Sequence, residues 1–263
     1  MLRIITANLN GIRSAAKKGF FEWLGAQNAD LVCVQELKAQ ADNMTDAFLA
    51  PYGYAGHFHY ALKKGYSGVG LYTRHVPDAC ITGLVHEAFD AEGRYVEVRY
   101  GRLSVISLYA PSGTVSEARQ QVKYRFLDHL MPHLLALKQA GREVIICGDI
   151  NIAHQNIDIK NWRGNLKHSG FLPEERAWLT QLFDPDQAGY VDVFRCLDTR
   201  PDQYTWWSNR GQAYAKNVGW RIDYQIGTPA MATRAQHASI FKDIKFSDHA
   251  PLTIDYDCCC SEF

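Results

Sequence analysis

Residues 143–158 read EVIICGDINIAHQNID. The stretch opens with the apolar, β-branched run EVII, which is typical of a buried strand. Polar residues follow at once, including Asp149 and Asn151. Two interpretations are open: a solvated loop at a strand end, or the floor of a binding site. Asp and Asn are common in turns, so the stretch alone does not decide between them.

The same pattern, an apolar strand that ends in polar side chains, recurs along the chain. We predict such strands at residues 2–7, 30–34, 103–108, 143–147, 221–226 and 251–256. The polar residues within or beside them are Asn8, Asn10, Glu36, Tyr109, Asp149, Asn151, Asp223, Asp248 and His249. Asp223 is expected in the middle of its strand. Loops converge at strand ends while the sheet holds them rigid, so these side chains are expected to build one site.

Helical periodicity lies between several of the strands. Helices are predicted at 20–27, at 122–137 and, with Pro173 in the first turn, through 183. The runs 94–100 and 103–108 flank Gly101 and indicate a hairpin. This mixture of hairpins and helix-linked strands predicts an α/β (α+β) chain with two sheets and helices outside. One domain is expected at 1–257, followed by a short tail at 258–263, CCCSEF, outside the last strand.

Composition narrows the class of protein. Lys plus Arg and Asp plus Glu number 28 each, and a net charge of zero argues against a protein that coats a polyanion. Seven cysteines, with no C-x-x-C pair, do not suggest a disulfide framework, so a reducing compartment is expected. No apolar run approaches the roughly 20 residues of a membrane span. Because the first strand begins at once, we expect a soluble, cytoplasmic protein.

The chemistry of the polar set points to a hard metal ion. It is rich in carboxylate and amide oxygens, contains one histidine and lacks cysteine. Such ligands suit Mg²⁺ or Mn²⁺ rather than a structural Zn²⁺. A metal-dependent phosphoester hydrolase needs the ion, a base for water, a donor for developing charge and help for the leaving oxygen. The set offers candidates for each of these parts.

Nine blocks, in order, carry a specific resemblance. They are ANLNGIRSA at 7–15, LVCVQELK at 31–38, SGVGLYTR at 67–74, LYAPSG at 108–113, GDINIAHQNID at 148–158, GFLPEERAWL at 170–179, YTWW at 204–207, KNVGWRIDY at 216–224 and SDHAPL at 247–252. Together they resemble the exonuclease III family of DNA-repair nucleases, within the endonuclease/exonuclease/phosphatase superfamily. The resemblance implies a four-layered sandwich of two packed mixed β-sheets flanked by helices.

The resemblance also implies roles for individual residues. Glu36 would be the main metal ligand, and Asp149 would orient and deprotonate the attacking water. Asn151 would donate to the phosphoryl oxygens, while His249, oriented by Asp223, would contact the scissile phosphate. Tyr109 would bind phosphate or assist the leaving group. The complete metal set implied is Asn8, Glu36, Asp149, Asn151, Asp248 and His249.

The expected partner is double-stranded DNA with a nick, a 3′ block or an abasic site, bound by a monomer. Trp207 is expected in the core, and the Lys63–Ser67 segment is a second candidate for DNA contact. Within the block at 148–158, Asn156 and Asp158 are interpreted as loop structure, and His154 has no assigned role. The expected DNA and phosphate contacts are Asn10, Asn161, Arg163, Asn165, Lys167, His168, Trp206 and Trp220.

His168 departs from the pattern of the family. Many relatives have an N-x-x-x-N-x-x-N-like loop with Asn or a small residue last, whereas here Asn161 and Asn165 are followed by a bulkier imidazole. We hypothesise that His168 favours exonuclease or 3′-phosphatase activity over internal cleavage at abasic sites. Simple variation on a solvent-facing loop is the alternative. Abasic-site cleavage as the main activity, a phosphatase for a small or lipid phosphoester, and a catalytically dead DNA-binding module also remain open.

Overall fold

Alternating side chains along β1 (Leu2–Asn8) point into two different cores. In the computed structural model, which describes residues 1–263, Leu2 and Ile4 lie in a core shared by both sheets. Ile5 and Ala7 lie in another core, on the opposite face of the sheet. Successive side chains of a strand point to opposite faces, so an apolar strand of this kind is covered on both sides.

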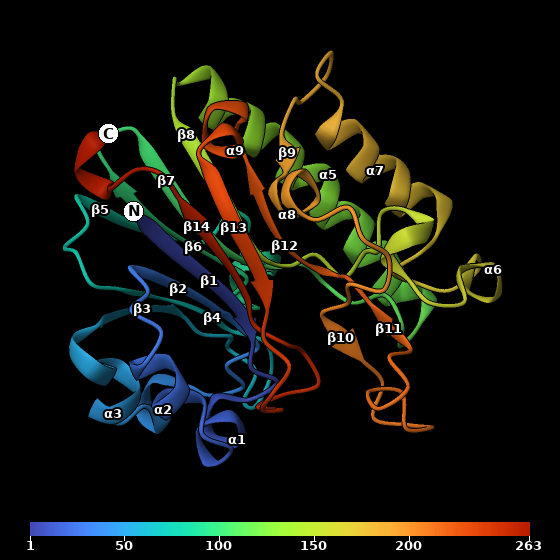
Figure 1. The fold of residues 1–263 in the computed structure, drawn as a ribbon, viewed down its shortest axis with the longest axis horizontal. Coiled ribbons are helices and arrows are strands. Elements are labelled where there is room, and N and C mark those ends of the chain that lie inside the picture. Colours follow the sequence, from blue (N-terminus) through green and yellow to red (C-terminus); the bar gives the residue numbers. More distant parts are fainter.

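β8 (Glu143–Asp149) repeats this division in the second sheet. Ile145 and Cys147 lie in the core between the two sheets, called the middle core below. Val144 and Ile146 lie in a third core, together with residues of α5 and α7. Three cores separate four layers, and Figure 1 shows them in order from α2 and α3 at one side to α5 and α7 at the other. The predicted sandwich of two mixed sheets flanked by helices is confirmed.

The first sheet has the strand order β13, β14, β1, β2, β4, β3. β1 and β2 are parallel, and all other neighbours are antiparallel. Its other strands are β2 (Leu31–Gln35), β3 (Ala55–His59), β4 (Val69–Thr73), β13 (Ala235–Ile240) and β14 (Leu252–Tyr256).

The second sheet has the order β5, β6, β7, β8, β12, β9, and only β7 and β8 are parallel. A separate two-stranded ribbon, β10 and β11, lies at one end of the sandwich (Figure 1). The remaining strands are β5 (Ala79–Thr82), β6 (Tyr95–Tyr100), β7 (Leu103–Tyr109), β9 (Val191–Asp192), β10 (Trp206–Trp207), β11 (Gly219–Trp220) and β12 (Asp223–Gly227).

The longest helix is α5 (Glu117–Gln139), which covers the outer face of the second sheet. The Ser116 hydroxyl oxygen caps it by accepting a hydrogen bond from the Arg119 backbone N–H at 3.2 Å. The side chains of Phe126 and Leu130, on the face of the helix toward the sheet, are buried. It begins earlier than predicted and continues through Pro132. The other helices are α1 (Ile12–Lys17), α2 (Phe20–Gly25), α3 (Asp46–Leu49), α4 (Glu87–Asp90), α6 (Trp162–Asn165), α7 (Pro173–Phe183), α8 (Val193–Leu197) and α9 (Pro229–Thr233).

Asp223 lies differently from the sequence-based expectation, and the tail makes contacts that the sequence did not predict. Asp223 is the first residue of β12, because the Ile222 and Asp223 backbone N–H groups both bond the Thr205 hydroxyl. The tail packs against the body: Cys258 is buried in the middle core, and the Phe263 carbonyl accepts the Arg102 N–H at 3.1 Å.

Both termini lie at the end of the sandwich away from β10 and β11 (Figure 1). All seven cysteines carry free thiols. None of the helices combines the length and the apolar character that crossing a membrane requires.

Candidate active site

The register of the second sheet places three predicted site residues side by side. Tyr109 ends β7 and pairs with Asp149, the last residue of β8. Asp149 in turn pairs with Asp223, which begins β12. Because β7 and β8 are parallel and β12 is antiparallel to them, two strand ends and one strand start meet at the same edge.

The first sheet supplies residues from its own parallel pair. Asn8 ends β1, and Glu36 directly follows β2. The Asn8 amide nitrogen donates to Glu36 Oε1 and to Asp149 Oδ2, both at 2.9 Å. This single side chain therefore links the polar ends of the two sheets.

His249 reaches the same edge because β14 runs antiparallel to β1. Residues just before β14 thus lie beside the end of β1. The His249 Nδ1–H donates to Asp223 Oδ2 at 2.9 Å, and its Nε2 lies 3.9 Å from Asp149 Oδ2. The predicted hydrogen bond between His249 and Asp223 is present, and it fixes the imidazole so that Nε2 faces the site.

Glu36, Asp149 and His249 can hold a metal ion. One ligand atom from each lies within 4.8 Å of the others. Two carboxylates beside one imidazole, without thiolate, suit Mg²⁺ or Mn²⁺. The donor set therefore fits the ion that the sequence predicts.

Asn8 and Asp248, also predicted as ligands, have different contacts. Asn8 turns its amide nitrogen, a donor, toward both carboxylates, and its oxygen accepts the Asn10 N–H at 2.9 Å. Asp248 accepts the Asn10 side-chain amide at 2.7 Å and the Trp206 indole at 3.1 Å. Asn8 thus orients the carboxylates, because an amide nitrogen cannot bind a hard cation.

Burial and like charge make Asp149 a stronger base than an ordinary aspartate. Burial and the neighbouring Asp223 carboxylate raise the pKa of Asp149 to about 8. Burial lowers the pKa of His249, but the Asp223 and Asp149 carboxylates outweigh it and raise that pKa to about 10. Across the 3.9 Å between Asp149 Oδ2 and His249 Nε2, the imidazolium charge lowers the pKa of Asp149 without outweighing burial and Asp223, and the Asp149 carboxylate contributes to the raised pKa of His249.

Tyr109 and Glu36 are shifted in opposite directions. Burial, followed by the Glu36 and Asp149 carboxylates, raises the pKa of Tyr109 well above its usual range, so its hydroxyl stays a donor. Burial also raises the pKa of Glu36, but the Lys38 ammonium at 2.9 Å outweighs this and lowers it overall. Glu36 is thus held ionised, as a metal ligand must be.

The backbone is strained at several of these positions. Asn10, Glu36 and Asn151 have φ values of 45°, 51° and 57°, in the left-handed region that disfavours side chains. At Asn151 this conformation lets the backbone N–H donate to Asp149 Oδ1 at 2.8 Å and the side-chain amide donate to the Ala110 carbonyl at 2.9 Å. Strain of this kind is common at functional sites.

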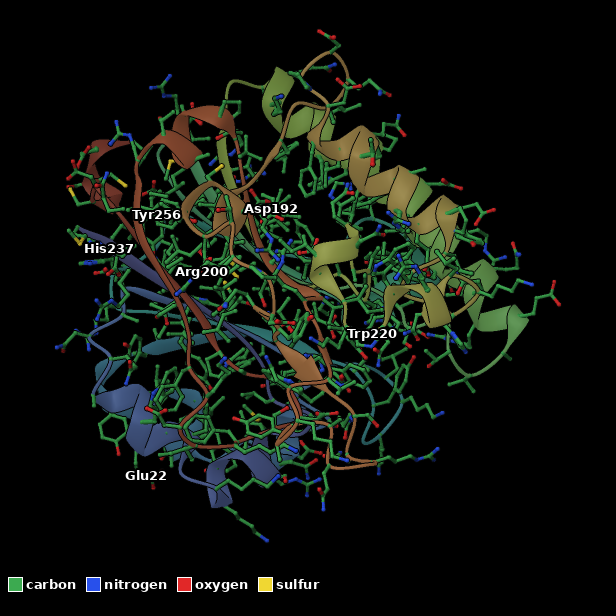
Figure 2. The ribbon with its side chains drawn as sticks, turned by 45° about the vertical axis from the view of Figure 1, so that its right-hand side comes forward. Glu22, Asp192, Arg200, Trp220, His237 and Tyr256 are labelled. Atoms are coloured by element: carbon green, nitrogen blue, oxygen red, sulfur yellow. The ribbon has the colours of Figure 1, made fainter.

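A cavity of about 340 Å³ opens above these residues. Trp206 and Trp220 form one wall, with ring centres 6.0 Å apart and an edge-to-face geometry. Trp220, labelled in Figure 2, is the last residue of β11 and pairs with Trp206 of β10. The cavity is lined by Glu36, Tyr109, Ser112, Thr114, Asp149, Asn151, Asn165, His168, Ser169, Gly170, Trp206, Trp220, Ile222, Asp248 and His249.

The predicted DNA contacts divide into two groups. Asn165, His168, Trp206 and Trp220 line the cavity, as expected for residues that meet the substrate. Asn161, Arg163 and Lys167 are exposed on the surface around α6, outside the cavity lining, and Asn10 lies behind Asp248. Trp207 is buried, as predicted.

Two supporting cations were not predicted from the sequence. Lys38 bonds both Glu36 and the Asn10 side-chain oxygen. The buried Arg94 guanidinium lies over the Tyr109 ring at 4.9 Å and donates to the Tyr109 carbonyl at 2.9 Å. The sequence signal for Lys38 was its place two residues after Glu36; Arg94 offers none, because its neighbours in space are distant in the chain.

Tyr66 connects the Lys63–Ser67 segment to this support. Its hydroxyl accepts from Arg94 at 3.0 Å and from Arg119 at 2.7 Å. The segment is therefore joined to the residues behind Tyr109, and its lysines lie on the exposed side.

The chain is similar over nearly its whole length to nucleases and a phosphatase that act on DNA. An exodeoxyribonuclease of Bacillus subtilis (strain 168) is 36% identical over 257 residues, which cover 96% of this chain and 98% of that protein. The structure of an AP endonuclease from Archaeoglobus fulgidus superposes with a TM-score of 0.89 at 28% identity, covering 98% of this chain and 100% of that one. A 3′ phosphatase, NExo from Neisseria, bound to a product DNA hairpin, gives 0.86 at 25% identity, covering 98% of this chain and 100% of that one.

The profile of the Endonuclease/Exonuclease/phosphatase family matches residues 5–249. The match begins in β1 and ends at His249, so it contains every element that contributes to the metal and catalytic residues. The chain belongs to the Endonuclease/Exonuclease/phosphatase family.

Proposed function

We propose that this DNA-repair phosphodiesterase acts mainly on 3′ termini of double-stranded DNA, as a monomer that uses Mg²⁺ or Mn²⁺. One observation carries the proposal: the Glu36–Asp149–His249 cluster opens into a cavity whose rim includes His168. The cluster accounts for phosphoester hydrolysis, and the rim accounts for the choice of DNA end.

The residues present suit hydrolysis of a phosphodiester. Asp149 accepts a proton from the attacking water, and Asn151 donates its amide to the phosphoryl oxygens. His249, held by Asp223, and the neutral Tyr109 hydroxyl complete the set of donors around the phosphate. When bound by Glu36 with the Asp149 carboxylate beside it, the metal ion would supply positive charge that neutralises phosphate oxygens.

The preference for 3′ ends rests on the size and position of His168. An internal abasic sugar must enter the cavity with DNA continuing on both sides, so it needs an open rim. A 3′-terminal phosphate or nucleotide needs less room. The exposed imidazole of His168 occupies this rim and narrows it for the larger substrate. The relative described as a 3′ phosphatase supports this specialisation within the family.

The test compares three duplex substrates: a 3′-phosphate nick, a recessed 3′ end and an internal abasic site. Mg²⁺-dependent activity should be highest on the two 3′ substrates and should be lost with EDTA. His168→Gly should raise abasic-site cleavage relative to 3′-phosphate removal by roughly tenfold, a difference of about 1.4 kcal/mol in the barrier. Unchanged relative rates would refute the role of His168.

The same assay addresses the alternatives. Highest activity of the wild type on the abasic site would make abasic-site endonuclease the main function, as the names of several relatives suggest. Metal-independent binding without cleavage would indicate a dead DNA-binding module. A small-molecule or lipid phosphatase would neither bind nor cleave the duplexes.

A further inference from the structure

A buried ion pair lies directly behind the cavity, between α5 and α7. Lys123 Nζ lies 2.5 Å from Glu175 Oε1, and neither side chain is exposed to solvent. None of the catalytic or DNA-binding roles above uses either residue. A fully buried pair of this kind rarely stabilises a fold more than apolar residues would, so the geometry that it enforces needs another explanation.

Glu175 accepts hydrogen bonds from the segment that follows His168. Its Oε2 accepts the Gly170 backbone N–H at 2.6 Å and the Leu172 N–H at 3.0 Å. Its Oε1 accepts from Lys123, from the Gln120 amide at 2.9 Å and from the Ser169 hydroxyl at 3.3 Å. Three of these five donors belong to the segment and two belong to α5, so the carboxylate ties the segment to that helix.

Lys123 links Glu175 to Asn151, which follows β8 at the active-site edge of the second sheet. Its ammonium also donates to the Asn151 carbonyl at 2.8 Å. One buried cation therefore touches both the carboxylate that holds the His168 segment and the backbone of a predicted catalytic residue.

Gly170 brings the segment into close contact with the cavity wall. Its φ is +93°, and a Cβ at this position would lie 2.9 Å from the Trp220 ring and 3.1 Å from the Asn151 carbonyl oxygen. The Gly170 carbonyl accepts the Ala153 N–H at 2.8 Å. The backbone just after His168 therefore packs closely against Asn151 and Trp220, and it cannot move toward them without a steric clash.

We propose that the Lys123–Glu175 pair is a positioning device that fixes the His168 segment relative to Asn151 and thereby sets the preference for DNA ends. This inference rests on the proposed role of His168. Glu175 never touches the substrate; it acts by keeping the imidazole at the rim while Asn151 stays in place.

The experiment is a double-mutant cycle between Glu175→Gln and His168→Gly. A glutamine has one acceptor oxygen where the glutamate has two, so it cannot hold Gly170, Leu172 and Lys123 at once. In the wild-type background we expect Glu175→Gln to lower the ratio of kcat/KM for the 3′-phosphate nick to that for the abasic site by roughly tenfold, within the hundredfold that a displacement of about 1 Å can produce. In the His168→Gly background, the ratio should change by less than about twofold.

Glu97→Gln is the matched control. Glu97 is also fully buried and accepts from Arg99 at 2.6 Å, Ser104 at 2.6 Å and Tyr95 at 2.8 Å, but it lies within β6, away from the cavity. It should lower stability without moving the substrate ratio in either background. Hydrogen exchange at Gly170 and Leu172 should accelerate in Glu175→Gln and not in Glu97→Gln.

The outcomes separate the two proposals. An equal shift in both backgrounds, or no shift in either, would overturn the positioning role even where His168→Gly behaves as proposed. If His168→Gly itself leaves the ratio unchanged, the proposed role of His168 fails, and the positioning role fails with it. Should Glu175→Gln not fold, Lys123→Met/Glu175→Gln removes the unpaired charge and is judged by the same ratios.

Discussion

His249 is oriented by one buried acceptor, Asp223. Replacing that acceptor by an amide leaves the shape of the site intact but removes the charge that selects the tautomer of the imidazole. We expect Asp223→Asn to lower kcat on a 3′-phosphate nick by about 10² to 10⁴-fold, with little change in KM. Steady-state kinetics measure both constants, and circular dichroism checks the fold.

The control for this change is Asp198→Asn. Asp198 forms an ion pair with Arg200 at 2.6 Å, remote from the cavity. The variant Asp198→Asn should leave kcat unchanged, because the ion pair of Asp198 with the exposed Arg200 contributes little to stability. A comparable loss of kcat in both variants would show that Asp223 has no special role.

Individual residues were predictable where the chain itself places them at a strand end. Asp149 and Asn151 follow an apolar run, and the structure puts both at the cavity. The orientation of Asn8 was not predictable, because it depends on Glu36 and Asp149 lying on either side of its amide. Sequence patterns report that an amide is present, but its contacts require the two sheets to be packed.

Between the elements, Asp158 has a role beyond loop structure. Its carboxylate, in the turn 156–158, accepts from Arg221 just before β12 at 2.8 Å and from Arg195 of α8 at 2.7 Å. Burial raises the pKa of Asp158, but the two guanidinium groups outweigh it and lower the pKa to about 2. The sequence interpretation was incomplete because both arginines are distant in the chain.

These two ion pairs of Asp158 predict a pH dependence of the free energy of unfolding. The folded pKa of Asp158 lies below its ordinary value of 3.8, so its contribution is present above about pH 4 and is lost as the pH falls through about 2. The shift corresponds to about 2 kcal/mol. Urea unfolding should therefore show Asp158→Asn to be less stable than the wild type at pH 7, with the difference shrinking between pH 4 and 2.

Asp186→Asn provides the comparison, because Asp186 is exposed and its side chain makes no ion pair. The free energy of unfolding of Asp186→Asn should equal that of the wild type at every pH from 7 to 2. A constant gap between the wild type and Asp158→Asn down to pH 2 would mean that the carboxylate charge is not what stabilises the turn.

Elements were predicted well when their own side chains decide them. The apolar, β-branched run of β8 and the helical periodicity of α5 are local signals, and both elements exist. The β10–β11 ribbon was not predicted, because each strand has only two residues and depends on pairing with the other. The packing of the tail likewise depends on the β6–β7 hairpin, which the terminal residues meet only after folding.

At the scale of the whole molecule, the two sheets converge on a concentration of negative charge. Glu36, Asp149, Asp223 and Asp248 lie at one edge, two of them fully buried, with His249 and Lys38 as partners. A divalent cation that binds there only in the folded state should stabilise the entire chain. At about 100 times its dissociation constant it adds about 2.7 kcal/mol, or roughly 5 to 10 °C in Tm.

Calorimetry with Mg²⁺ and with EDTA measures this shift. KCl at the same ionic strength should raise Tm much less than Mg²⁺ does. The variant Asp149→Asn removes one of the crowded carboxylates, so it should have a higher Tm than the wild type without metal. The same variant should show a smaller increase in Tm on addition of Mg²⁺. An equal increment in KCl would argue against a specific site.

The fold class could be predicted because apolar runs alternating with polar ends require two covered sheets. The order of strands in each sheet could not, since neighbours such as β12 and β8 are more than seventy residues apart. Lys123 and Glu175 show the same limit: each looks like an ordinary surface residue of an amphipathic helix, and only the packing of α5 on α7 buries them.

The groups assigned to hydrolysis lie at or next to strand ends of both sheets, whereas His168, at the rim, lies in the segment between α6 and α7. If His168 selects the DNA end as proposed, changes in this segment alter that selection without disturbing the hydrolytic groups. The proposed choice of DNA end and the hydrolytic chemistry therefore depend on separate parts of the scaffold, and substitutions around His168 leave the strand ends that carry the hydrolytic groups untouched.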